Sequence, residues 1–532
     1  MRHLGFLVLL LTTAPAAAQN GVAREMPAAA AAVSEKSIDE LRAMIASGAS
    51  SSEQLTKAYL DRIALLDRSG PMLRSVIATS PDALEQARAS DARRRAGKPL
   101  GPLDGVPVLI KDNIETKELP TTAGSLALKD NHTRRDAPVV ALLRAQGAVI
   151  LGKTNLSEWA NIRSSKSMSG WSVVGGLVRN PYALDRSSCG SSSGSGAAVA
   201  ASLAAVAVGT ETDGSVVCPA AMNGLVGLKP TIGLVSRTHV VPISHSQDTP
   251  GPMGRSVKDV ALLFSGMIGA DPADATTAAA DRHRRDYAAG LSAEGLKGMR
   301  IGYWRPEMAD DLGVAFDAAL AQLRAAGATV VEVKMPKLDG LGDAEFLVLK
   351  AELKADLDAY LATTPASVKT RTLAQVIAFN DANKAAEMPF FGQEIFLDAE
   401  KTKGLADPDY KAAREKSLRL AKQGLDEMMK AAGAQILVTP TYGTPWLSDP
   451  AHGDQFSGPS ASELPAVSGY PHLTVPMGLV DGLPAGLSFI GAAFSDGLLL
   501  RAGYAYEQQA KARVAPSFAP TIAVDLGPRG IR

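Results

Sequence analysis

The sequence predicts an α/β protein: a single large α/β/α domain with a mixed central sheet. Short runs of apolar and β-branched residues, typical of buried strands, alternate along the chain with segments whose apolar residues recur at helical spacing. The chain has 532 residues, 46% of them hydrophobic, which is enough for a sizeable core. No internal repeat and no long linker divides it, so we expect one main domain.

The predicted elements of the first half follow from local patterns. Residues 55–66 carry apolar side chains at helical spacing and predict a helix. Ser80-Pro81-Asp82 is a typical helix start, because the serine hydroxyl can cap a helix and proline lacks the N–H that would stay unpaired. The apolar run 106–110 predicts a buried strand that ends at Lys111. A helix over 139–145 and a strand over 148–151 follow.

Small residues dominate the middle of the chain. Residues 196–208 are almost all Ala, Val, Ser and Leu, so we expect a closely packed, buried helix and strand. Beyond residue 290 the alternation continues. The predicted elements are strands over 299–303, 329–333 and 435–438 and a charged amphipathic helix over 411–432.

The N-terminal residues predict an export signal. Arg2 and His3 precede eight apolar residues, too few to span a bilayer, and Ala16-Ala17-Ala18 fits a cleavage site. We expect a periplasmic protein without stable membrane insertion after signal removal. The expected division is a signal peptide over 1–18, a flexible leader over 19–35, the main domain over 36–515 and a C-terminal tail over 516–532.

The charge balance argues against nucleic acid as a partner. Basic and acidic residues number 55 each, and the cluster Arg93-Arg94-Arg95 lies where a helix is predicted to end, a favourable place for cations. The two cysteines, Cys189 and Cys218, are too few for a disulfide scaffold. Export would permit a bridge between them, but we expect free, buried thiols.

Two short patterns match known motifs on weak grounds. Residues 147–154 fit the P-loop expression, but the apolar run inside them predicts a strand rather than a loop of exposed N–H groups. Residues 190–194 fit the nucleophile elbow of Ser-His-Asp α/β-hydrolases, with Ser192 as nucleophile. Serine-rich and glycine-rich runs match that pattern easily, so this interpretation stays a distant alternative.

A lysine and two glycine-flanked serines form a third constellation. Lys111 ends an apolar strand, whose burial would lower the pKa of the lysine and make it a base. Ser191 and Ser215 lie in two glycine-rich turns joined by the small-residue segment. Two serines and a lysine can perform acyl transfer without histidine, metal or cofactor.

Segments around these residues and further along the chain share the pattern of one known family. They are Gly190-Ser-Ser-Ser-Gly-Ser-Gly196, Gly209-Thr-Glu-Thr-Asp-Gly-Ser215, Gly224-Leu-Val-Gly-Leu-Lys-Pro230, Gly105-Val-Pro-Val-Leu-Ile-Lys-Asp-Asn113, Leu151-Gly-Lys-Thr-Asn155, Asp248-Thr-Pro-Gly-Pro-Met253 and Gly469-Tyr-Pro-His-Leu-Thr-Val-Pro476. Over roughly residues 35–510 the chain resembles the amidase signature family. The resemblance implies the amidase signature fold, with Ser215 as nucleophile, Ser191 as a bridging serine held by a cis peptide bond and Lys111 as base.

The turn before Ser215 is expected to form the oxyanion hole. Backbone N–H groups of Thr212, Asp213 and Gly214 would face the developing negative charge. The side chain of Asp213 either contacts the substrate or satisfies the turn itself, and the sequence leaves both interpretations open.

Departures from the common family pattern narrow the range of substrates that we expect. Glu211, Asp213 and Val217 replace residues usual in the family, and the resulting run resembles the peptide amidase branch, as do segments 378–380 and 391–394. That resemblance implies release of ammonia from peptide C-terminal amides. A broad aliphatic, aryl or fatty-acid amidase is the alternative, whereas the export signal argues against a component of tRNA-dependent amidation. The expected partner is a small-molecule or peptide amide.

Overall fold

The computed structural model describes residues 26–522, which form an α/β protein with a mixed sheet, as predicted. Eleven strands of the described chain pair in the order β1-β3-β2-β6-β8-β7-β12-β13-β11-β9-β10. The strands are β1 (Val76–Thr79), β2 (Pro107–Lys111), β3 (Val149–Thr154), β6 (Val206–Glu211), β7 (Val226–Lys229), β8 (Thr249–Gly254), β9 (Arg300–Tyr303), β10 (Thr329–Glu332), β11 (Ile436–Pro440), β12 (His472–Val480) and β13 (Leu483–Gly491). A separate two-stranded ribbon pairs β4 (Trp171–Ser172) with β5 (Gly176–Leu177).

Helices cover both faces of the sheet. They are α1 (Ala28–Ala32), α2 (Ile38–Ala46), α3 (Ser52–Arg62), α4 (Ala83–Arg95), α5 (Pro138–Ala145), α6 (Ser193–Ala200), α7 (Val217–Met222), α8 (Val257–Ser265), α9 (Asp310–Ala325), α10 (Leu341–Ala362), α11 (Leu373–Ala382), α12 (Lys384–Glu387), α13 (Glu394–Glu400), α14 (Pro408–Ala432), α15 (Glu463–Ser468) and α16 (Asp496–Ala510). Short 3-10 or π turns occupy Ile63–Asp67, Leu126–Leu128, Glu158–Asn161 and Ala275–His283.

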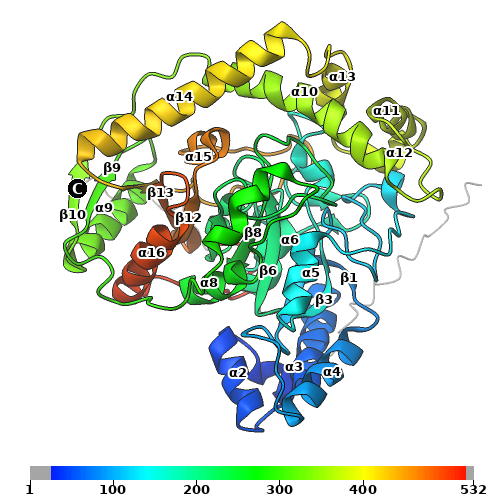
Figure 1. The fold of residues 1–532 in the computed structure, drawn as a ribbon, viewed down its shortest axis with the longest axis vertical. Coiled ribbons are helices and arrows are strands. Elements are labelled where there is room, and N and C mark those ends of the chain that lie inside the picture. Colours follow the sequence, from blue (N-terminus) through cyan, green and yellow to red (C-terminus); the bar gives the residue numbers. More distant parts are fainter. Residues whose placement is uncertain (1–25, 523–532) are drawn as a thin grey trace, which may run out of the picture.

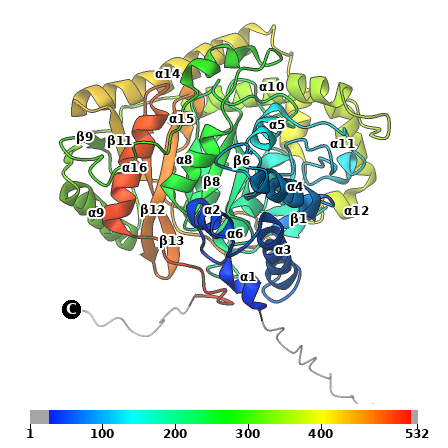
Figure 2. The same cartoon turned by 60° about the horizontal axis from the view of Figure 1, so that its bottom comes forward.

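The alternating side chains of β12 show that the sheet lies between two layers of helices. Gly503 of α16 lies so close to Leu473 that an added Cβ would stand 2.5 Å from its Cδ2. The next residue, Thr474, lies beside Gly486 and Ala221 of α7. Because successive side chains of a strand point to opposite faces, α7 and α16 cover opposite faces of the sheet. Figure 2 shows β12 and β13 behind α16.

The long helices α10 and α14 run side by side across one end of the molecule, in lime green and yellow in Figure 1. Helices α2, α3 and α4, in blue, lie at the other end. The small-residue segment of the middle forms α6 and β6, whose residues are all buried, as predicted. Helix α6 and strand β6 thus form the buried core next to the serine-rich turn that precedes α6.

The N-terminal and C-terminal segments differ from their predictions. The flexible leader is wrong for residues 28–33, because helix α1 packs there and Ala30 and Val33 are fully buried. The buried guanidinium of Arg62 donates to the carbonyls of Ala30 and Ala201 and so ties α1 to the core. The predicted tail begins by pairing with residues 181–184. The predicted signal peptide and residues 523–532 lie outside the described residues.

No helix within residues 26–522 combines the length and apolar character that crossing a bilayer requires. The P-loop interpretation is also not supported, because its residues form strand β3. The P-loop lysine, Lys153, is buried and forms an ion pair with Asp112, 3.0 Å apart, and a hydrogen bond to Thr121. The amine of Lys153 is therefore used in structural contacts and is not free to bind a phosphate.

Candidate active site

Lys111 lies at the end of β2 and is fully buried. Its Nζ is 2.7 Å from Ser191 Oγ, 2.8 Å from Thr210 Oγ1 and 3.2 Å from the Thr210 carbonyl oxygen. Asn113 donates to the same threonine hydroxyl at 2.9 Å, which fixes it beside the amine. The lysine is thus held by three close oxygens from β6 and the serine-rich turn.

Burial dominates the titration of this lysine. Removal from water disfavours the ammonium and lowers the pKa of Lys111 to about 7, although the carboxylates of Asp248 and Glu211 act in the opposite direction. A large fraction of the side chain is therefore a neutral amine near neutral pH. A neutral amine that touches a hydroxyl can accept its proton.

Ser191 follows a cis peptide bond, as the resemblance implies. The residue is fully buried, and its carbonyl accepts a hydrogen bond from the Ser157 backbone N–H at 3.1 Å. A side chain at Gly190 would clash with Ser157 Oγ, so only glycine fits before the serine. These contacts fix the serine hydroxyl at the amine of Lys111.

Ser215 lies two residues before α7 and is the member of the predicted trio that reaches solvent, at 8% exposure against 0% for the other two. Its carbonyl accepts from the Ser192 N–H at 3.2 Å, which brings the two serine turns side by side. In the described structure no hydrogen bond joins the hydroxyls of Ser191 and Ser215. Lysine and bridging serine are thus in direct contact, and Ser215 faces the cavity next to them.

The turn 212–215 leaves its backbone donors free. Within residues 26–522, no oxygen accepts a hydrogen bond from the N–H groups of Thr212, Asp213 or Gly214. The carboxylate of Glu211 accepts from the N–H groups of Val216 and Val217, at 2.8 and 2.9 Å, and so fixes the entry into α7. Free N–H groups beside a serine can stabilise an oxyanion.

Asp213 lines the cavity beside these donors. Burial raises the pKa of its carboxyl group, and its Oδ1 is buried without a hydrogen-bond partner in the described structure. Burial also raises the pKa of the neighbouring Glu345 well above its usual range, and the charge of Asp213 adds to the effect. The two buried carboxyl groups thus lie close together behind the cavity, and Asp213 is the one that lines it.

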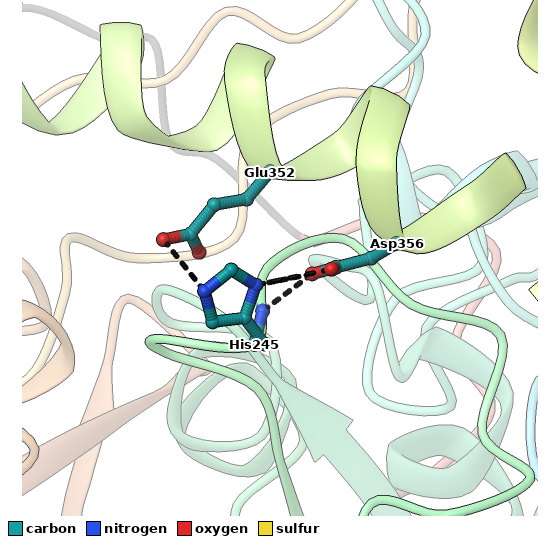
Figure 3. Close-up of side chains that lie close together, drawn as sticks. All are labelled: His245, Glu352 and Asp356. Carbon is teal, nitrogen blue, oxygen red and sulfur yellow. Dashed lines mark hydrogen bonds and ion pairs between the residues drawn. The ribbon is translucent and has the colours of Figure 1, made fainter. Parts of the chain in front are cut away.

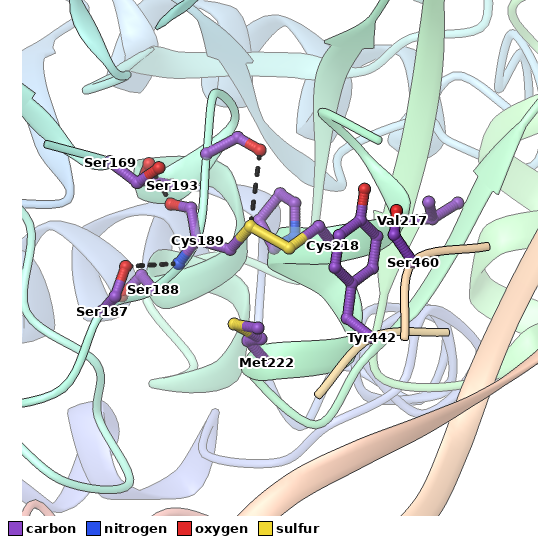
Figure 4. Close-up of a disulfide and its surroundings, with 12 residues drawn as sticks. Ser169, Ser187, Ser188, Cys189, Ser193, Val217, Cys218, Met222, Tyr442 and Ser460 are labelled. Carbon is purple, nitrogen blue, oxygen red and sulfur yellow. Dashed lines mark hydrogen bonds between the residues drawn. A yellow bond between two sulfur atoms is a disulfide. The ribbon is translucent and has the colours of Figure 1, made fainter. Parts of the chain in front are cut away.

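The prediction of free thiols is wrong, because Cys189 and Cys218 form a disulfide (Figure 4). The two serine turns meet, which places the cysteine Cα atoms 6.0 Å apart, within the range a bridge requires. The bridge joins the segment two residues before Ser191 to the helix that follows Ser215. Both sulfur-bearing residues line the cavity.

The cavity that opens onto Ser215 has a volume of about 270 Å³. Its far wall comes from residues that the sequence motifs do not indicate, since nothing in their spacing points to a site. They are Ile162, Leu349, Tyr442, Trp446, Asp454 and Phe456. Phe456 packs edge-on against Tyr442 and Trp446, with ring centroids 5.6 and 5.8 Å apart. Thr210 and Asp248 were also missed as single residues, although both lie in quoted motifs.

The hydroxyl of Ser192, the alternative nucleophile, is used in hydrogen bonds to the backbone. It is buried, donates to the Thr210 carbonyl at 3.1 Å and accepts from the Thr210 N–H at 3.2 Å. No histidine contributes to these bonds. The Ser-His-Asp interpretation therefore lacks both an accessible nucleophile and its base.

His245 lies between two acidic side chains of α10 (Figure 3). Its Nε2 is 3.3 Å from Glu352 and its Nδ1 is 2.9 Å from Asp356, and the Asp356 hydrogen bond raises the pKa of the imidazole. The three side chains are close enough for a metal ion. However, Ser246 and Tyr410 already donate to Glu352, at 2.6 and 2.7 Å, so hydrogen bonds account for the arrangement.

This cluster anchors the loop that contacts the turn 212–215. Three residues after His245, Asp248 accepts hydrogen bonds from Thr212 Oγ1 at 2.6 Å and from the Ile243 N–H at 2.8 Å. Burial raises the pKa of Asp248 to about 6. The loop is therefore attached to α10 at one end and to Thr212 at the other.

Fold and site together define a hydrolytic enzyme with a buried lysine–serine pair beside a cavity-facing serine. The chain belongs to the amidase family, whose model, described as Amidase, matches residues 54–500. It is therefore an amide-hydrolysing enzyme, and the resemblance drawn from the motifs is confirmed.

Three similar proteins illustrate the range of the family. The native peptide amidase of Stenotrophomonas maltophilia is 49% identical, with a TM-score of 0.88, and the match covers 91% of this chain and 99% of that one. A probable amidase of Arabidopsis thaliana is 39% identical over 91% of this chain and 92% of its own length. One component of the glutamyl-tRNA(Gln) amidotransferase of a Synechococcus strain is 35% identical over 86% of this chain and 89% of its own length.

Proposed function

We propose that the enzyme releases ammonia from the C-terminal carboxamide of peptides by way of an acyl-enzyme. The observation that carries the proposal is the buried Lys111–Ser191 hydrogen bond beside Ser215, which is the residue of the three that lines the cavity. Such a chain of groups can transfer a proton from a nucleophile to a base. No cofactor takes part in the proposed steps.

In the proposed relay, Ser215 attacks the amide carbonyl while Ser191 accepts its proton and passes its own to neutral Lys111. The hydrogen bond between the two serines is absent from the described structure, and we propose that it forms when substrate is bound, as catalytic contacts often tighten in the complex. The tetrahedral intermediate places its oxyanion at the N–H groups of residues 212–214. Each such donor contributes about 3–4 kcal/mol to stabilisation of the transition state.

Collapse of the intermediate breaks the C–N bond, and the proton returns through Ser191 to the departing ammonia. Water then attacks the acyl group on Ser215, with the same relay accepting its proton. The products are ammonia and the peptide acid. Asp213, whose side chain lines the cavity, is placed to accept a hydrogen bond from the carboxamide NH₂ or from a substrate main-chain N–H.

The substrate assignment draws support from two sides. The solved peptide amidase matches nearly its whole length to this chain at 49% identity. The cavity combines aromatic walls with unused hydrogen-bonding groups, as binding of a short peptide requires. Broad aliphatic or aryl amidase activity is the alternative within the family.

The test is ammonia release from a capped dipeptide amide, with Ser215→Ala as control and mass spectrometry of the products. Ammonia plus the intact peptide acid, absent with the variant, is the expected result. Release from simple aliphatic or aryl amides alone would replace the peptide substrate class. Release that persists in Ser215→Ala would overturn the site.

We also propose that the enzyme works in an oxidising, exported location. The disulfide between Cys189 and Cys218 supports this, because such bonds persist mainly outside the cytosol. Cell fractionation of the native host tests it. Enzyme found only in the cytosolic fraction would contradict the proposal.

A further inference from the structure

The residues that line the active-site cavity include two acidic side chains and no basic one. The charged residues that line the cavity are Asp213 and Asp454, both acids. Burial raises the pKa of the Asp454 carboxyl group, and the groups that favour its ionised form are the neutral Ser169 and Trp446. A charge desolvated in this way is stabilised by any cation that enters the cavity.

Asp454 is held in a fixed position on that wall. One carboxylate oxygen accepts from the Trp446 indole N–H at 3.0 Å and from the Ser169 N–H at 3.0 Å. The other accepts from Ser169 Oγ at 2.5 Å and shares the Ser169 N–H at 3.1 Å. These donors align the carboxylate and still leave it capacity for a further donor, since two carboxylate oxygens offer about four acceptor sites.

Aromatic rings stand next to this carboxylate. Trp446 both donates to Asp454 and packs edge-on against Phe456, which in turn packs against Tyr442. The faces of such rings attract cations, and a carboxylate beside them adds direct charge attraction. Guanidinium and ammonium groups match this combination, because both carry N–H donors as well as positive charge.

The carboxylate also lies near the catalytic turn. Ser169 Oγ, its hydrogen-bond partner, stands 3.0 Å from the place a Cβ of Gly190 would take, and Gly190 directly precedes Ser191. Asp454 and Ser215 line the same cavity, so a substrate whose carbonyl lies at Ser215 has the side chain of its own residue within reach of this carboxylate. The group that meets the carboxylate is then the side chain adjacent to the scissile amide.

We propose that Asp454, with Trp446 and Phe456, forms a cation subsite that selects amides whose terminal residue is arginine or lysine. This rests on the proposed function and names the substrate class of the same site. Asp454 acts on binding and selectivity, at the side chain of the substrate, whereas the relay acts on its carbonyl. The two roles are therefore separable by experiment.

The experiment compares Nα-acetyl-arginine amide with Nα-acetyl-citrulline amide, which has nearly the same shape but no charge. The wild-type enzyme is expected to favour the arginine amide at least tenfold in kcat/KM, mainly through a lower KM, and 0.5 M KCl should reduce that preference. Asp454→Asn is expected to bring the ratio of the two kcat/KM values to about 1. Because the ratio compares two substrates of the same variant, a general loss of activity from the altered wall does not affect it.

Asp449→Asn is the matched control, because Asp449 lies on the same loop, bonds to His452 and does not line the cavity. It should keep the wild-type ratio. Equal kcat/KM for both amides in the wild type, or a preference that survives Asp454→Asn, would overturn the subsite and leave the proposed function standing. Absence of Ser215-dependent ammonia from either amide would overturn both.

Discussion

Replacement of Lys111 by methionine should destroy activity and reveal the cost of burying a lysine. The pKa of the folded-state amine is about 7, against an ordinary value of 10.5. Between these pH values the unfolded chain binds one proton more than the folded chain, so wild-type stability falls as the pH falls from 10.5 to 7. The shift corresponds to a destabilisation of roughly 5 kcal/mol, fully present below pH 7 and absent above pH 10.5.

Lys111→Met removes this pH dependence. The free energy of unfolding of the variant minus that of the wild type should therefore grow by roughly 3 kcal/mol as the pH falls from 9.5 to 7, and stay constant below 7. Thr210 and Ser191 lose a hydrogen-bond partner, which costs about 1–3 kcal/mol but does not change with pH over this range. Activity should fall at least 10²-fold, the scale of a general base.

The assay is urea unfolding followed by circular dichroism at several pH values, in parallel with ammonia release. Lys57→Met is a matched control, because Lys57 is exposed and its replacement should give a difference that hardly changes with pH. A pH-independent difference for Lys111→Met would show that the buried lysine stays charged in the folded enzyme. That result would refute the neutral-amine relay.

Three further predictions concern the same centre. The kcat/KM of the wild type should fall about tenfold per pH unit below pH 7, because protonated Lys111 cannot accept a proton; a flat profile between pH 5 and 7 would contradict this. Ser192→Ala should keep at least roughly a tenth of the activity, whereas Ser215→Ala should lose it at unchanged circular dichroism; equal losses would restore Ser192 as nucleophile. The double replacement of Cys189 and Cys218 by alanine should lower the unfolding free energy by about 3 kcal/mol and reduce kcat more than it changes KM; urea unfolding and kinetics that match the wild type would contradict a positioning role.

The positions of Lys111, Ser191 and Ser215 could be predicted because they depend on short stretches of sequence. An apolar run predicts the strand that buries Lys111, and glycine-rich segments predict the turns that carry Ser191 and Ser215. These residues lie within motifs whose spacing is fixed by a few neighbouring elements. The α/β class and most strands followed from the same short-range patterns.

The cavity wall could not be predicted, because it depends on contacts between distant segments. Trp446 and Asp454 reach the site only when the loop after β11 folds over the turn near Ser169, almost 300 residues earlier. Neither has a periodic pattern or a flanking motif. The predictions for the cysteines and for residues 28–33 were wrong for a related reason. The disulfide forms because two turns meet in the tertiary structure, and α1 is held by the buried side chain of Arg62. The composition of a single segment indicates neither contact.

The division of the cavity between two parts of the chain has a consequence for protein engineering. The groups of the proposed chemistry come from residues 111–218, whereas the aromatic and acidic wall comes largely from residues 442–456. The loop that carries this wall is joined to the catalytic segment by backbone hydrogen bonds of Trp446 and Ser448 with residues 185–187 and by the bond of Asp454 to Ser169. None of these contacts involves the hydrogen bonds of Lys111. Libraries confined to this loop can therefore explore new amide substrates while the relay keeps its hydrogen bonds, and loop exchange between family members offers the same freedom.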